Sequence, residues 1–149
     1  DVDRIVVREE VKRNNHDLNL ILKLIGAKFS KQWAVFHNYG YRGLYGGLAE
    51  NQIHHRKGLK PHQAILDHMG FEELAANMYR TSLTQQYLKK YPTDTVLLAC
   101  LLHKKMGERV RQDHVDLGLD LPEDMPAVET IKEAYRRLKA LETEKERVK

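Results

Sequence analysis

The feature that most limits how this chain folds is an eight-residue stretch that contains four glycines and two tyrosines. Its members are Gly40, Tyr41, Gly43, Tyr45, Gly46 and Gly47, with Arg42 and Leu44 between them. Flexible linkers are polar and lack aromatic residues. Glycine instead serves where the backbone takes a positive φ or approaches another group closely, and the aromatic side chains favour burial. We therefore predict a rigid, packed turn over residues 40–47.

Apolar residues recur at helical spacing over most of the chain, and no alternating strand pattern of any length occurs. In the first segment Val7, Val11, Leu18 and Leu22 fall on one face, and Gly26 follows as a helix stop. The spacing predicts helices over residues 3–25, 48–56, 61–69, 72–91, 94–117 and 128–147, with a short mixed segment at 33–39. We predict an all-α fold, a compact domain of five to seven helices.

The length of 149 residues fits one domain, residues 1–149, with its own hydrophobic core. The C-terminal segment, residues 127–149, carries Ile131, Tyr135, Leu138 and Leu141 in near-heptad spacing. Two heptads are too few to establish a coiled coil. Packing against the first helix or against a second subunit would bury this stripe equally well. A homodimer through the terminal helices is therefore one expectation.

Several classes of site and location are disfavoured by the residues themselves. The histidines His54, His55, His62 and His68 include no pair spaced four apart, as a helical metal site requires, so no metal is expected. No serine sits in a nucleophile motif, and we expect no catalytic residue and no cofactor. Cys100 lies in the longest apolar run, which is seven residues long and too short to span a membrane. A single buried cysteine is compatible with a reducing compartment, and we expect a cytoplasmic protein.

Basic residues near stackable rings provide the strongest functional signal. The net charge is +4, and cations follow the glycine-rich stretch closely. Cations beside aromatic rings are typical of proteins that bind single-stranded nucleic acid, because the cations meet phosphates and the rings meet bases. The alternative is a solvated helix end with buried tyrosines. The candidate residues for binding nucleic acid or a partner are Arg42, His54, His55, Arg56, Lys57, Lys60 and Arg111.

The segments around this basic stretch resemble a known family. They are residues 36–48 (FHNYGYRGLYGGL), 53–60 (IHHRKGLK), 65–70 (ILDHMG) and 73–84 (ELAANMYRTSLT), with weaker similarity at 99–111 and 121–126. Together they resemble the C-terminal part of the DNA-damage-inducible protein D (DinD) family, with a core match over about 33–118 within a region of roughly 8–126.

The resemblance implies a bacterial or phage protein tied to the SOS response that acts on RecA–single-stranded DNA filaments without catalysis. It also implies that the chain is either a C-terminal portion or a short stand-alone relative, because the family's N-terminal antirepressor-like portion is absent. Phe71 and Ser82-Leu83 stand where the family tends to have polar residues. We expect a RecA-type filament, single-stranded DNA or both as partners. The alternative is a phage-type antirepressor or inhibitor that binds a protein without contacting DNA.

Overall fold

The structure is a computed structural model that describes residues 2–148, so Asp1 and Lys149 of the predicted domain lie outside the described residues. Within that range the chain forms six α-helices and two short 3-10 helices and no strand, which confirms the predicted all-α fold. The elements are α1 (Val2–Ile25), α2 (Ser30–Leu44), α3 (Glu50–Arg56), η1 (Ile65–His68), α4 (Phe71–Lys90), α5 (Val96–Leu117), η2 (Pro122–Asp124) and α6 (Ile131–Val148).

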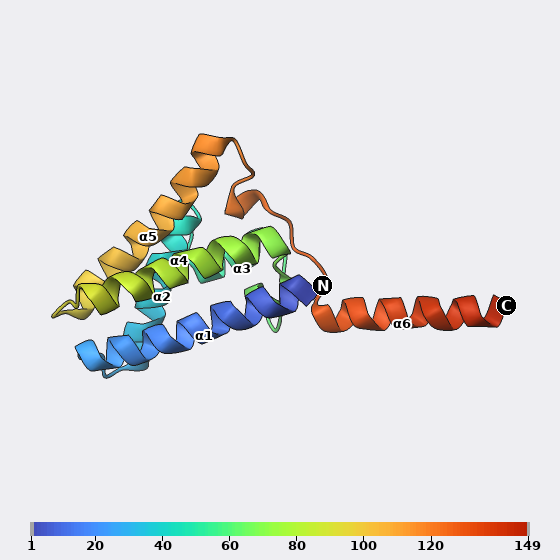
Figure 1. Cartoon of the computed structure of the whole chain (residues 1–149), viewed down its shortest axis with the longest axis horizontal. Helices are drawn as coiled ribbons and strands as arrows, with labels where there is room; N and C mark the ends of the chain where they lie inside the picture. The colour runs from blue at the N-terminus through green and yellow to red at the C-terminus, as the bar shows by residue number, and fades with distance from the viewer. Residues whose placement is uncertain (1, 149) are drawn as a thin grey trace.

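Four long helices form the body of the molecule (Figure 1). α1 and α4 lie parallel, since Arg4 bonds to the carbonyl of Met69 near their starts and Gln85 bonds to Asp17 further along. α2 and α5 are also parallel to each other. Both run in the opposite direction to α1 and α4, because α2 begins where α1 ends and α5 begins where α4 ends. α6 starts beside the N-terminus of α1 and extends away from this body.

Two glycines of α2 allow it to approach α5 closely. A Cβ atom on Gly43 would lie 2.1 Å from the carbonyl oxygen of Lys104, and one on Gly40 would lie 2.4 Å from the ring of His103. Gly107 of α5 lies at the same contact, because a Cβ there would lie 2.7 Å from the backbone nitrogen of Leu44. These glycines therefore serve helix–helix contact and not a change of chain direction.

The prediction of a turn over the whole of residues 40–47 is accordingly wrong for its first half. Gly40, Tyr41 and Gly43 belong to the last turns of α2. Only the segment from Tyr45 to Gly47 forms a turn, with φ of 65° at Gly46 and 103° at Gly47. The mixed segment predicted at 33–39 is also helical, in a helix that begins where the side chain of Gln32 accepts a hydrogen bond from the backbone of Phe29.

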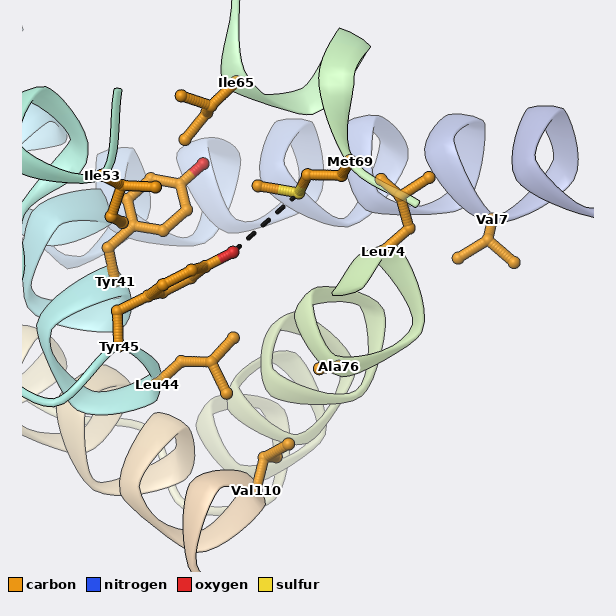
Figure 2. Close-up of a cluster of buried hydrophobic side chains, with 10 residues drawn as sticks. All are labelled: Val7, Tyr41, Leu44, Tyr45, Ile53, Ile65, Met69, Leu74, Ala76 and Val110. Carbon is orange, nitrogen blue, oxygen red and sulfur yellow. Dashed lines mark hydrogen bonds between the residues drawn. The ribbon is translucent and has the colours of Figure 1, made fainter. Parts of the chain in front are cut away.

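The tyrosines of the stretch are buried, as their spacing between glycines predicts. Tyr41 and Tyr45 lie in a core cluster with Ile53, Met69 and Leu74, and Figure 2 shows the ring of Tyr45 directed toward Met69. A second cluster joins the ends of α1 and α4 to the starts of α2 and α5; its members include Leu22, Phe36, Leu88, Ala99 and Cys100. Burial raises the pKa of the Cys100 thiol to about 11.

Four predicted helix boundaries need correction, and the first is that of α3, which begins at Glu50 and not at residue 48. Residues 61–69 form a turn followed by the single turn of η1, because Gln63 folds back to accept a hydrogen bond from the backbone of Lys60. The N-cap of α5 is Thr95, whose hydroxyl accepts a hydrogen bond from the backbone of Leu98. α6 begins at Ile131 and not at residue 128, because Thr130 and Glu133 form a reciprocal capping box.

Candidate functional site

Lys57, one of the predicted binding residues, points into the protein. Its ammonium lies 2.6 Å from Oε1 of Glu73 and 3.0 Å from the carbonyl of Met125. The two charged side chains are 3% and 1% exposed. Lys57 is therefore committed to an internal ion pair, and its prediction as a surface cation is wrong.

Arg56 and Arg111 are also paired within the chain. Arg56 donates to Asp124 at 2.8 Å and to the carbonyl of Glu123 at 2.7 Å. Arg111 donates to the carboxylate of Glu123 at 2.6 Å, and this hydrogen bond raises the pKa of Arg111 above its ordinary value. Both arginines thus fasten η2 to α3 and α5. The structure therefore brings Arg56 and Arg111 close together, but both are paired with the acidic residues of η2 and do not form a free cationic surface.

The other four predicted binding residues do not share one environment. His54 bonds through its ring to the carbonyl of Gln63 at 2.8 Å. Arg42, His55 and Lys60 are exposed, and none of the three makes an ion pair with another described residue. Arg42 lies 5.9 Å from the ring centroid of Tyr39. The predicted cationic surface therefore reduces to three separate side chains.

Glu73 is the start of a buried chain of polar contacts that links α3, α2, α4 and α5. Its carboxylate accepts hydrogen bonds from Lys57 and from the hydroxyl of Tyr45. Asn77 donates to the same hydroxyl at 3.0 Å. Burial raises the pKa of Glu73 above its ordinary value, and the bonds from Lys57 and Tyr45 oppose that rise. Tyr45, predicted as part of a packed turn, thus also takes part in a buried polar network.

Arg80 continues this chain and is buried completely among neutral groups. It donates to Asn77 Oδ1 at 2.8 Å and to His103 Nε2 at 2.6 Å, and it lies over the ring of Tyr41 at 4.9 Å. Its Nε has no partner among the described residues. Because solvent does not reach these groups, they fix how α2, α4 and α5 pack and are not a binding surface. His103 is therefore an internal residue.

A different cationic surface forms at the opposite end of the body from α6. We call it the lysine end, and define it by five exposed lysines: Lys23, Lys28, Lys31, Lys89 and Lys90. They lie where α1 and α4 finish and α2 begins, over the second core cluster. No ion pair with another residue of 2–148 involves any of them.

The lysine end carries the whole excess charge of the chain. Five of the 25 lysines and arginines, but only Asp94 of the 21 acidic residues, lie in segments 20–35 and 86–98. The other 20 basic and 20 acidic residues cancel, so the net charge of +4 belongs to these segments. Cations in the last turns of α1 and α4 also complement the helix dipoles. That reason does not apply to Lys28 and Lys31, which lie at the N-terminus of α2, where the dipole disfavours a cation.

Exposed aromatic rings accompany these lysines. Phe29 is exposed between α1 and α2, and Tyr87 and Tyr91 lie together at the end of α4 with ring centroids 5.0 Å apart. Lys90 lies 5.8 Å from the ring centroid of Tyr91. Sequence reasoning missed this surface because its two segments are remote in the chain. The signal that would have indicated it is the run from 20 to 35, which has three lysines and no acidic residue.

Residues 2–148 contain neither a metal site nor a membrane-spanning helix. No group of three histidine, cysteine, aspartate or glutamate side chains converges there in a way that would hold a metal ion. None of the described helices is long and apolar enough to cross a bilayer.

Comparison with known proteins gives two matches. The family described as the DinD C-terminal domain matches residues 1–134. The DNA damage-inducible protein D of Escherichia coli (strain K12) is 40% identical over 143 residues, which cover 95% of this chain and 52% of that protein. The chain thus spans about half the length of this curated relative. No solved structure matches the chain.

Proposed function

Because this chain belongs to the DinD C-terminal domain family, we propose that it is a non-enzymatic, DNA-damage-associated module whose lysine end contacts single-stranded DNA within RecA-type filaments. The observation that carries the proposal is the location of the excess charge. All of the net +4 lies at one end of the helical body, on lysines that form no ion pair with another residue of 2–148. The Escherichia coli relative of this chain is named as a DNA damage-inducible protein. That name supports DNA as the anionic partner of the lysine end and the bacterial cytoplasm as the place of contact.

The lysine end has the two kinds of group that single-stranded DNA requires. Its lysines would neutralise phosphates, and counterion release would make the affinity strongly dependent on salt. Tyr87, Tyr91 and Phe29 offer exposed faces on which unpaired bases would stack, and stacking needs no particular sequence. Bases in a duplex do not present these faces, so we expect a preference for single strands.

Exposed leucines beside the lysines support contact with protein as well. Leu97, Leu98 and Leu101 are exposed on the first turns of α5, next to the second core cluster. An apolar patch bordered by cations suits a partner in which protein and nucleic acid lie side by side. A recombinase filament on DNA is such a partner, and the module would modulate it by competing for or clamping the filament.

The test is binding to a fluorescently labelled oligothymidylate, followed by anisotropy. The triple variant Lys28→Ala, Lys31→Ala and Lys90→Ala should bind at least about tenfold more weakly than the wild type, because several phosphate contacts are lost together. The matched control removes three exposed cations elsewhere: Arg42→Ala, Lys60→Ala and Lys105→Ala. Both triples lose the same charge. Equal weakening by the two, or none by the first, would exclude the lysine end as the DNA site.

The leucines also favour a second candidate function, an antirepressor or inhibitor that binds a protein without DNA. Co-sedimentation with a RecA-type recombinase, with and without single-stranded DNA, separates the two. A protein inhibitor would bind without DNA, and the double variant Leu98→Glu and Leu101→Glu would abolish that binding while the lysine variants would not. A DNA-dependent module would co-sediment only with the filament.

A further inference from the structure

α6 has an apolar face that its own chain covers only at the base. Ala134 is the buried residue of this helix, in its first turn beside the body. Beyond it Tyr135, Leu138 and Leu141 are exposed, the two leucines by 50% and 47%. Figure 1 shows the rest of the helix extending clear of the other elements. A helix of this kind is stable in water when another helix covers its apolar stripe.

The face follows a heptad. Ile131, Ala134, Leu138, Leu141 and Val148 occupy successive core positions, and Lys145 takes the remaining one. We propose that α6 pairs with α6 of a second copy of this chain, antiparallel, with Leu138 of each copy against Leu141 of the other. This register is symmetric, so that one contact, made twice, closes the dimer.

The charges on the helix favour a second copy as the occupant. In this register the positions that flank the leucines bring Arg137 of one copy beside Glu144 of the other, twice. Both side chains are exposed and of opposite sign. In a single copy, Arg137 forms an ion pair with Glu129 of its own chain at 2.6 Å. Both side chains are exposed, so replacing this pair by one with Glu144 of the other copy costs little free energy.

The orientation follows from Lys145. In a parallel pair, Lys145 would face Lys145 of the other copy inside the seam, and like charges there repel. In the antiparallel pair, Lys145 lies level with the uncharged Ala134, near the base of the other helix.

A groove at the base of α6 is placed to receive the end of the second helix. It has a volume of about 610 Å³, and its lining includes Ile5, Ile131 and Tyr135. In the proposed register Val148 of the second copy comes level with Ile131. The groove thus extends the apolar contact beyond the two central leucine layers, which is needed because two heptads alone are marginal.

Sedimentation equilibrium over a wide concentration range tests the association. The wild type should dimerise reversibly, and the variant Leu138→Glu and Leu141→Glu should stay monomeric. The control variant Ala140→Glu and Thr143→Glu adds the same charge to the opposite face of the exposed helix and should dimerise as the wild type does. A wild-type protein that is monomeric at every concentration would overturn the proposal, as would equal loss in both variants.

Charge exchange tests the orientation. Arg137→Glu alone should weaken the dimer about tenfold, since two attractive pairs become repulsive. Adding Glu144→Arg should restore it, whereas adding Glu142→Arg should not. The reverse result would indicate a parallel pair and overturn the register. Circular dichroism of each monomer controls for the loss of the Glu129 pair.

Cross-linking gives an independent measurement. Val148→Cys alone should not form a disulfide-linked dimer, because the two cysteines would lie about 25 Å apart along the axis, at roughly 1.5 Å per residue. A mixture of Val148→Cys and Ile131→Cys chains should cross-link. Efficient cross-linking of Val148→Cys with itself would contradict the antiparallel arrangement. The same mixture with Leu138→Glu and Leu141→Glu added controls for random collision.

Discussion

Arg80 donates a hydrogen bond to Nε2 of His103, and the imidazole accepts it because its Nδ1 donates to the carbonyl of Phe36. A neutral ring is therefore part of the folded structure. Burial and the charge of Arg80 lower the pKa of His103 well below its ordinary value. Burial and the same charge lower the pKa of the neighbouring His37 from 6.5 to about 4.

Stability should consequently fall as the pH decreases from about 6.5 toward 4. The unfolded chain binds protons on both histidines in this range while the folded chain resists them, so the free energy of unfolding is highest above the unfolded pKa. His37 contributes up to about 3 kcal/mol by this linkage. Urea unfolding between pH 4.5 and 7.5 measures the slope, and His37→Gln should reduce it by up to about 1.4 kcal/mol per pH unit. An unchanged slope in His37→Gln would contradict the assignment.

Removing Lys57 should unfold the protein more readily than removing any exposed lysine. Lys57→Met leaves the carboxylate of Glu73 buried with Tyr45 as its remaining charge-stabilising partner. Loss of one member of a buried ion pair costs about 3–5 kcal/mol. Chemical denaturation compares this variant with Lys60→Met, whose lysine is exposed and whose stability should change by less than about 0.5 kcal/mol. Equal stability of the two variants would show that Lys57 is not internal in solution.

Gly43→Ala should destabilise the protein by about 3 kcal/mol or more, through a forced separation of α2 and α5. The sign is diagnostic, because glycine to alanine within a helix ordinarily stabilises by up to about 1 kcal/mol. Gly118→Ala is the comparison: its φ is 68° and its Cβ would meet nothing within 4 Å, so only backbone strain of about 1 kcal/mol is expected. Thermal unfolding of both variants provides the measurement, and a stabilised Gly43→Ala would exclude the close helix contact.

The lysine end should account for most of the salt dependence of DNA binding. Each phosphate contact on a single strand contributes roughly 0.7 to the slope of log affinity against log salt. The variant without Lys28, Lys31 and Lys90 should therefore lose about 2 from that slope. Tyr91→Ser should instead lower affinity at every salt concentration by about 1–3 kcal/mol while leaving the slope unchanged, because stacking releases no counterions. Anisotropy titrations at four or more salt concentrations separate the two effects.

Sequence patterns predicted the helices better than the site, for a physical reason. The stripe of α4 is set by local spacing, and its bounds fall within one residue of the prediction. Gly40 and Gly43 carry no such local information, since close approach to α5 and a tight turn both favour glycine. Which cations remain free depends on partners remote in sequence: Glu73 for Lys57 and Asp124 for Arg56. The predicted binding residues were therefore chosen by composition, while tertiary contacts decide which of them reach solvent.

The length of the four-helix body separates the start of α6 from the lysine end (Figure 1). Energetic effects of substitutions are additive when the sites are distant and share no neighbours. A chain that combines Lys31→Ala with Leu138→Glu should thus show the summed free-energy changes of the single variants. Any surplus would measure communication between copies, such as two modules engaging one strand together. If both proposals hold, the architecture should make DNA binding and dimerisation genetically separable, so that each is lost while the other is kept.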